Sequence, residues 1–139
     1  MNSRRILIAD DDYDLLQALA VRCTSLGLQV DLAQDALAAV KSVLRYPPPD
    51  VICLDVNMPS GNGLGLCEML AADDDTAQIP VIIMTGSTDP EVVRRCHASC
   101  AYYVLKCDDL WSRIEPLLHE LVGQVANRPA VTLTTSRLC

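Results

Sequence analysis

Short unbroken runs of apolar residues, each followed at once by a polar side chain, constrain the fold of this chain more than any other feature. Such runs are typical of strands that are buried on both faces, because neither face then needs polar residues. Four unbroken runs lie at residues 6–9, 51–54, 81–84 and 102–105, and each predicts a strand. A fifth strand is predicted at residues 28–32, where apolar and polar residues alternate.

Helical spacing of apolar residues separates these predicted strands. Strands that alternate with helices predict an α/β fold, a doubly wound five-stranded parallel sheet with helices on both faces. Pro116 lies inside the last helical pattern and predicts a kink or a late start for that helix. The five predicted helices cover residues 13–26, residues 36–45, residues 64–72, a segment that begins at Asp89 and Pro90, and a last segment capped by Asp108 or Asp109.

Composition limits the number of domains and the choice of partners. The chain has 139 residues, about one domain, which we expect to span residues 4–123, with residues 124–139 as a tail or a truncated linker. A net charge of -7 disfavours direct binding of nucleic acid or of an anionic membrane surface. Seven cysteines, an odd number placed within apolar segments, favour reduced thiols and hence a cytoplasmic protein. No apolar run approaches the length of a membrane span.

The polar residues that follow the strands form the candidate site. In open α/β sheets ligands bind beyond the carboxyl ends of the strands, so these residues are expected to meet at one edge. They are Asp10, Asp11, Asp12, Asp55, Thr85 and Lys106. Clustered carboxylates beside a hydroxyl and an amine suit a divalent cation together with a tetrahedral anion. Each acid taken alone also has a structural interpretation: the first three can cap a helix, and Asp55 can be a turn residue.

Four stretches of the sequence resemble the receiver domain of two-component response regulators. They are residues 6–11 (ILIADD), residues 54–59 (LDVNMP) together with Gly63, residues 84–86 (MTG) and residues 103–106 (YVLK). The resemblance covers roughly residues 4–122. It implies a flavodoxin-like (βα)5 fold with the strand order 2-1-3-4-5 of the chemotaxis member of that family.

The resemblance also implies a role for each acid. Asp55 would be the phosphoacceptor, whose carboxylate attacks a phosphoryl group to form an aspartyl phosphate. Asp10, Asp11, the Asp55 carboxylate and the backbone carbonyl of Asn57 would hold Mg²⁺ or Mn²⁺. Asn57 and Ser87 would flank the phosphoryl site and influence its attack by water.

By the same resemblance, Lys106 would pair with one phosphoryl oxygen, and the Thr85 hydroxyl would move to bond another. Tyr103 matches the family's switch aromatic, which changes rotamer with Thr85 and reshapes the surface of the fourth helix, fifth strand and fifth helix. A packed strand tyrosine is the alternative interpretation. That surface would contact a downstream protein or a second copy of the chain, and a histidine kinase or histidine phosphotransfer protein would donate the phosphoryl group.

Several positions depart from the family pattern. Cys107 stands where the family has a proline after the lysine. We expect the bond before it to be trans, because a cis bond without proline costs about 3 kcal/mol. Ser60 and Asn62 alter the turn after Asp55, whereas Gly63, which the backbone there needs, is kept.

The leading hypothesis is a phosphoacceptor switch in two-component signal transduction, with no enzymatic activity beyond self-catalysed phosphotransfer and autodephosphorylation. A docking module that keeps the fold but is never phosphorylated is one alternative, motivated by Cys107 and Pro116. A haloacid-dehalogenase-type phosphohydrolase is another. That family has a second aspartate where this chain has Asn57, and its cap domain has no room here.

Overall fold

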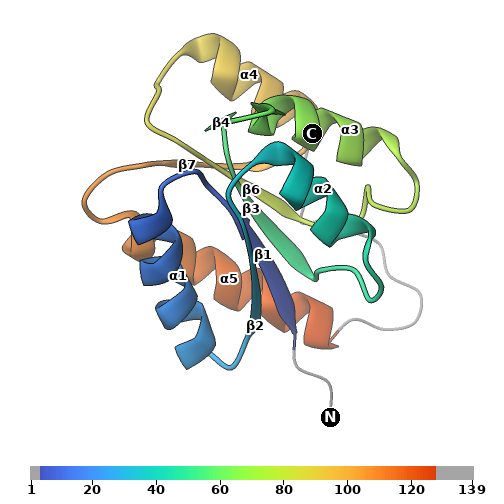
Figure 1. Ribbon diagram of the computed structural model, residues 1–139, viewed down its shortest axis with the longest axis vertical. Coiled ribbons are helices and arrows are strands. Elements are labelled where there is room, and N and C mark those ends of the chain that lie inside the picture. Colours follow the sequence, from blue (N-terminus) through green and yellow to red (C-terminus); the bar gives the residue numbers. More distant parts are fainter. Residues whose placement is uncertain (1–3, 128–139) are drawn as a thin grey trace.

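The computed structural model describes residues 4–127 of the chain, which form a sheet between two layers of helices (Figure 1). Five parallel strands pair in the order β2-β1-β3-β6-β7. Because β6 and β7 are the fourth and fifth strands of this sheet, the predicted order and the doubly wound α/β fold are confirmed. In chain order the elements are β1 (Arg5–Ala9), α1 (Tyr13–Ser25), β2 (Gln29–Ala33), α2 (Ala36–Leu44), β3 (Val51–Asp55), β4 (Asn57–Met58), β5 (Gly61–Asn62), α3 (Gly63–Ala72), β6 (Val81–Thr85), α4 (Pro90–Ala98), β7 (Tyr102–Leu105) and α5 (Leu110–Asn127).

Helices cover both faces of the sheet. Figure 1 shows α1 and α5 on one face and α2, α3 and α4 on the other. The strands β1, β3 and β6 are buried along their whole length. Their alternate residues enter two hydrophobic clusters: Leu7 and Ile52 pack with α2 and α3, whereas Ile6 and Cys53 pack with α1 and α5. This two-sided burial explains the unbroken apolar runs of the sequence.

Helix starts follow local signals in the sequence. Asp12 caps α1, since its Oδ1 accepts a hydrogen bond from Leu15 N at 3.1 Å. The expected start of α4 at Asp89 and Pro90 is confirmed: Asp89 is the cap and the proline occupies the first turn. Each of these caps satisfies a backbone N–H that has no partner inside its helix.

The segment after Asp55 contains structure that the apolar pattern did not predict. β4 and β5 pair antiparallel, with Asn57 opposite Asn62. Asn62 then caps α3, since its side-chain oxygen accepts a hydrogen bond from Gly65 N at 2.6 Å. Strands of two residues carry no measurable period, so the sequence indicated only a turn here.

The helix α5 runs unbroken through Pro116. It begins at Leu110, so the predicted late start is wrong. Proline leaves the carbonyl of Ser112 without its helical partner, but Pro116 and Ser112 both lie on the exposed face, where water can bond that carbonyl. On the opposite face Ile114 and Leu118 are each 1% exposed, and this packing against the sheet stabilises the helix.

The last helix reaches Asn127, beyond the expected domain end at residue 123. The division of the chain at that residue stays a prediction. Within residues 4–127, no helix combines the length and the apolar character that crossing a membrane requires.

Candidate functional site

Four strands bring polar residues to one edge of the sheet. Asp55 and Thr85 are the last residues of β3 and β6, while Asp10 and Lys106 directly follow β1 and β7. In a parallel sheet all four positions lie at the carboxyl ends of the strands, where ligands bind in this class of fold. The structure therefore brings together the strand-end residues that the sequence singled out.

Asp10, Asp11 and Asp55 form a cluster in which one carboxylate oxygen of each lies within 4.8 Å of the others. Asp10 and Asp55 are 0% and 5% exposed, whereas Asp11 is open to solvent. Asp10 Oδ1 also accepts a hydrogen bond from the backbone N–H of Asp12 at 2.9 Å. Carboxylate oxygens at this spacing can hold a hard divalent cation.

Lys106 lies between two of these acids. Its Nζ is 2.6 Å from Asp10 Oδ2 and 3.1 Å from Asp55 Oδ1. The ammonium group is the partner of Asp10 Oδ2, which no other donor among residues 4–127 reaches with hydrogen-bond geometry. The backbone N–H of Lys106 donates to the Thr85 carbonyl at 2.7 Å, which fixes where its side chain leaves the sheet. The lysine thus balances part of the charge of two buried carboxylates.

Burial and neighbouring charges shift the pKa values of this site. Burial raises the pKa of Asp55, and repulsion from Asp10 raises it further; the hydrogen bond and charge of Lys106 oppose this rise without cancelling it. Burial alone would lower the pKa of Lys106, but its hydrogen bonds and attraction to Asp10 and Asp55 raise it overall. Lys106 therefore stays charged at neutral pH, while ionised Asp55 carries a free-energy penalty that a bound cation would relieve.

A close backbone approach holds the segment around Asp55. Gly63 lies so near that a Cβ atom there would overlap the carbonyl oxygen of Asp55. The Gly63 N–H donates to the Val56 carbonyl at 2.8 Å, and the Val56 N–H donates to the Met84 carbonyl at 3.2 Å. Only glycine fits at position 63 without a steric clash with the backbone, which confirms the expectation that the backbone needs glycine there.

Thr85 and Tyr103 are connected through Ser87. Thr85 is 2% exposed, and its Oγ1 accepts a hydrogen bond from Ser87 N at 3.0 Å. The hydroxyl of Tyr103 donates to the Ser87 carbonyl at 2.6 Å, while its ring packs against the hydrophobic cluster that includes α2 and α3. Tyr103 is thus both a packed strand residue and a polar partner of the loop after β6. The apolar periods of the sequence carried no signal for this connection, because Ser87 lies outside them.

The remaining positions lie at the margin of the site. The Lys106–Cys107 bond is trans as predicted, since the one cis bond within residues 4–127 precedes Pro47. Cys107 is exposed, and its Sγ lies 2.8 Å from Asp109 Oδ1. Asn57 is exposed in β4, and its carbonyl as a metal ligand stays a prediction.

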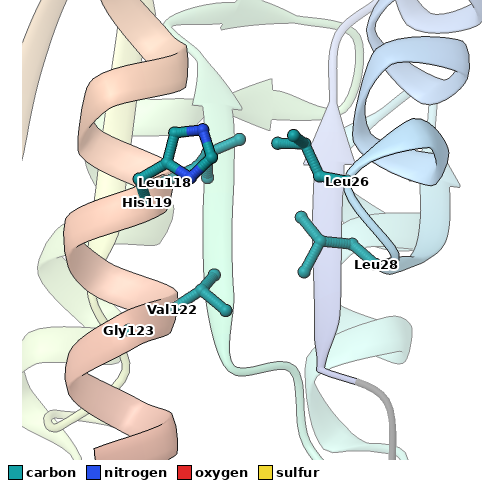
Figure 2. Close-up of a pocket in the computed structure, with 6 residues that line it drawn as sticks. All are labelled: Leu26, Leu28, Leu118, His119, Val122 and Gly123. Carbon is teal, nitrogen blue, oxygen red and sulfur yellow. The ribbon is translucent and has the colours of Figure 1, made fainter.

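An apolar pocket lies elsewhere on the molecule (Figure 2). Figure 2 shows Leu118 and Val122 of α5 facing Leu26 and Leu28 of the connection between α1 and β2. Leu28 directly precedes β2, so the pocket lies at the amino ends of the strands, opposite Asp55. The sequence-predicted site residues do not line it. The cavity measures about 250 Å³ and is lined by Leu26, Leu28, Leu118, His119, Val122 and Gly123.

Comparison with known proteins identifies the family. The family model of the response regulator receiver domain matches residues 6–114. Protein RcaC of Microchaete diplosiphon is 34% identical over 94 residues, which cover 68% of this chain and 14% of the relative. The DNA-binding response regulator MtrA of Mycobacterium tuberculosis is 31% identical over 104 residues, which cover 74% of this chain and 44% of the relative. The signal receiver domain of a signal transduction histidine kinase from Syntrophus aciditrophicus has a TM-score of 0.79 at 29% identity, covering 95% of this chain and 99% of that chain.

The chain therefore belongs to the response-regulator receiver domain family of two-component signalling, and the predicted resemblance is confirmed. Receiver domains are signalling domains with the flavodoxin-like fold described above. The chain spans 14% of the length of RcaC and 44% of the length of MtrA.

Proposed function

We propose that this chain is a phosphoacceptor of a two-component phosphorelay and that Asp55 receives the phosphoryl group. The observation that carries the proposal is the position of the Asp55 carboxylate, 3.1 Å from Lys106 Nζ and clustered with Asp10 and Asp11. A nucleophilic carboxylate needs positive charge around the phosphoryl oxygens, because phosphoryl transfer is catalysed mainly by positioning and by electrostatic stabilisation. Lys106 and a cation at the acidic cluster would supply that charge.

In the proposed step, one carboxylate oxygen of Asp55 attacks the phosphorus atom of the donor and forms a P–O bond. The bond between phosphorus and the donor's histidine nitrogen breaks, and its electron pair stays on that nitrogen. Lys106 pairs with a phosphoryl oxygen, and the Thr85 hydroxyl donates to another. Water later attacks the phosphorus atom, which releases inorganic phosphate and restores the Asp55 carboxylate.

Asp10, Asp11, the Asp55 carboxylate and the Asn57 carbonyl would hold Mg²⁺, or Mn²⁺ in its place. The donor set fits, because all four are the hard oxygen ligands that these ions prefer. When bound, the ion neutralises negative charge on the transferring phosphoryl group. The raised pKa of Asp55, caused by burial and by Asp10, agrees with a site where Lys106 alone does not balance three carboxylates.

The phosphoryl donor would be a histidine kinase or a histidine phosphotransfer protein. Phosphorylation would change the surface of α4, β7 and α5, where a downstream protein or a second copy of the chain would bind. MtrA is a DNA-binding response regulator, but the net charge of -7 supports protein contacts, not nucleic acid or membrane contacts, for this domain. We further propose that residues 4–123 act in the cytoplasm as a switch and not as a turnover enzyme.

Intact-mass measurement after incubation with Mg²⁺ and acetyl phosphate tests this proposal. We expect the wild type to gain one phosphoryl group and Asp55→Asn to gain none. Asp74→Asn, which removes an exposed acid from the connection between α3 and the amino end of β6, is the matched control and should gain the group. A chelator should abolish the gain of the phosphoryl group in both the wild type and Asp74→Asn.

The other outcomes separate the alternatives. A gain by Asp55→Asn, or a gain in the presence of chelator, contradicts the proposed chemistry. A folded wild type that gains nothing supports the docking module. Repeated turnover of a phosphate ester supports the phosphohydrolase.

A further inference from the structure

Exposed apolar side chains follow one another on the connection between α2 and β3. Leu44, the last residue of α2, is 74% exposed, and Tyr46 is 90% exposed. Pro47 and Pro48, which come next, are exposed as well. We call these four residues the loop patch. Neighbouring exposed apolar side chains are typical of interaction surfaces, and tyrosine is enriched among the residues that dominate binding.

Hydrogen bonds to the edge of the sheet hold the loop patch in place. The buried guanidinium of Arg5 donates to the Pro47 carbonyl and to the Asp31 carboxylate. The backbone N–H of Arg5 donates to Asp50 Oδ2 at 2.8 Å, and the Asp50 N–H donates to the Arg5 carbonyl at 2.9 Å. The loop patch is therefore anchored to β1 and β2, which lowers the entropy that its binding to a partner would cost.

The apolar pocket of Figure 2 lies at the same end of the sheet as the loop patch. Leu28 directly precedes β2 and the loop patch precedes β3, so both features lie at the amino ends of the parallel strands. A cavity of about 150 Å³ holds a benzene ring. The cavity between Leu118, Val122 and Leu28 measures about 250 Å³, so it has room for a tyrosine side chain.

Tyr46 does not fill the pocket of its own copy. Figure 1 shows α2, which leads into the loop patch, and α5, which lines the pocket, on opposite faces of the sheet. The 90% exposure of Tyr46 agrees with this separation. A second copy of the chain can bring its loop patch to the pocket, because both features lie at one end of the molecule.

Charges beside the loop patch and the pocket are complementary. Arg45, next to Tyr46 in the chain, is 61% exposed and bonds Asp31 at 2.9 Å. Glu115 is 41% exposed and lies 3.4 Å from His119, which lines the pocket. A guanidinium group has five N–H donors, so Arg45 can bond a second carboxylate while it keeps the first. The rim of the pocket therefore carries an anion that the cation beside Tyr46 can pair with.

We propose that two copies of this chain form a closed dimer in which the loop patch of each copy docks on the pocket of the other. Tyr46 of one copy fills the pocket of the second copy, where Arg45 meets Glu115. A two-fold axis between the patch and the pocket makes both contacts at once. The dimer leaves the carboxyl ends of the strands open, so it does not rest on the proposed phosphorylation of Asp55.

The net charge of the chain sets the conditions for a test. Two copies with a charge of -7 each repel one another at low salt. At about 0.15 M salt, charges more than about 8 Å apart are largely screened. Short-range contacts such as those of Tyr46 then decide whether the copies associate.

Sedimentation equilibrium of the whole chain at this salt concentration tests the dimer. We expect wild type to change from monomer to dimer as its concentration rises from micromolar to millimolar, without larger species. Tyr46→Ala removes both tyrosine contacts, and at about tenfold per contact the association constant should fall about 100-fold. Gly123→Leu should have the same effect, because it places a side chain in the pocket at a position where a Cβ meets no atom within 4 Å. Tyr13→Ala is the matched control and should associate like wild type, since this tyrosine is 58% exposed at the first residue of α1, at the opposite end of the sheet.

A mixture of the two variants tests the reciprocal contact. In the mixed dimer, Tyr46 of the Gly123→Leu copy can dock in the open pocket of the Tyr46→Ala copy. One of the two contacts is then kept, whereas each variant alone keeps neither. We therefore expect the mixed dimer to associate about tenfold more strongly than either variant alone. Native mass spectrometry separates the mixed dimer from the others by its mass.

Four results would overturn the proposal. The first is a wild type that stays monomeric over the whole range of concentration. The second is a wild-type dimer that Tyr46→Ala and Gly123→Leu both retain, because its interface then lies elsewhere. The third is a mixture that associates no more strongly than the separate variants. The fourth is wild-type species that grow beyond the dimer, because they indicate an open head-to-tail contact.

Discussion

Lys106 Nζ lies 2.6 Å from Asp10 Oδ2, the oxygen of a carboxylate that is fully buried at the end of β1. The lysine therefore has a structural role in the resting protein in addition to its proposed contact with a phosphoryl group. Asp10 depends on this ammonium, because an unpaired buried carboxylate costs several kcal/mol. A cation bound by the acidic cluster would share that role.

Replacing the lysine with an uncharged residue should destabilise the fold. Urea denaturation of Lys106→Met at pH 7 should give a free energy of unfolding about 2 kcal/mol below that of wild type. This loss is smaller than the loss expected on breaking a fully buried ion pair, because Lys106 is 25% exposed. Excess Mg²⁺ should narrow the difference. Arg94→Met, which breaks the exposed pair with Glu91, should leave the free energy unchanged; an equal effect of the two variants contradicts the role of Lys106.

The raised pKa of Asp55 predicts a pH-dependent gain of stability in Asp55→Asn. Burial and repulsion from Asp10 raise this pKa above the unfolded value of about 3.9. Below that value the group is protonated in both states, so wild type and variant should differ little in charge-dependent stability. As the pH rises through the folded pKa, ionisation destabilises only the wild type. Denaturation at pH 4 and pH 7 should therefore show an advantage of Asp55→Asn that grows with pH.

Asp31→Asn provides a control of opposite sign. Burial would raise the pKa of Asp31, but hydrogen bonds and attraction from Arg5 and Arg45 lower it overall. Its ionised form stabilises the fold at neutral pH and loses that effect as the pH falls through the folded pKa. Asp31→Asn should therefore lose stability relative to wild type as the pH rises. The same pH trend in both variants contradicts the opposite shifts.

The close approach of Gly63 to Asp55 predicts an unusual cost for one added methyl group. In Gly63→Ala the new Cβ would overlap the Asp55 carbonyl, so we expect a loss of about 1–3 kcal/mol in the free energy of unfolding. In Gly123→Ala the Cβ meets no atom within 4 Å, and α5 should gain about 0.5–1 kcal/mol from the better helix former. Thermal denaturation of both variants tests these two predictions. A Gly63→Ala variant as stable as wild type would contradict the close contact.

The proline within α5 predicts a substitution that stabilises the protein. Pro116→Ala restores an N–H that can bond the Ser112 carbonyl, and should raise the free energy of unfolding by about 1–3 kcal/mol. Pro90 lies in the first turn of α4, where a backbone N–H would have no helical partner. Pro90→Ala should therefore change the free energy of unfolding by less than about 0.5 kcal/mol. Equal effects of the two substitutions would show that the missing hydrogen bond is not the cause.

Features encoded by burial and by local caps could be predicted from the sequence. The unbroken run before Asp55 predicted β3 because both faces of that strand are buried. The convergence of Asp10, Asp55, Thr85 and Lys106 followed from parallel topology, since the carboxyl ends of parallel strands share one edge. The start of α4 at Asp89 followed from its cap and from the proline behind it.

Features that depend on single contacts could not be predicted in this way. The ribbon of β4 and β5 is too short to show a period. The continuity of α5 through Pro116 depends on packing of the opposite face, which outweighs the local cost of proline. The bonds of Ser87 to Thr85 and Tyr103 depend on loop geometry, which no spacing of residue types reveals.

Borohydride reduction of the phosphorylated protein tests the assignment of Asp55 most directly. This reagent converts an acyl phosphate into an alcohol, and peptide mass spectrometry then locates the modified residue. We expect the alcohol at Asp55 alone, dependent on Mg²⁺ and on the phosphodonor. The alcohol at Asp10 or Asp11, or a phosphate that resists reduction because it is attached to a serine or threonine, would contradict the assignment.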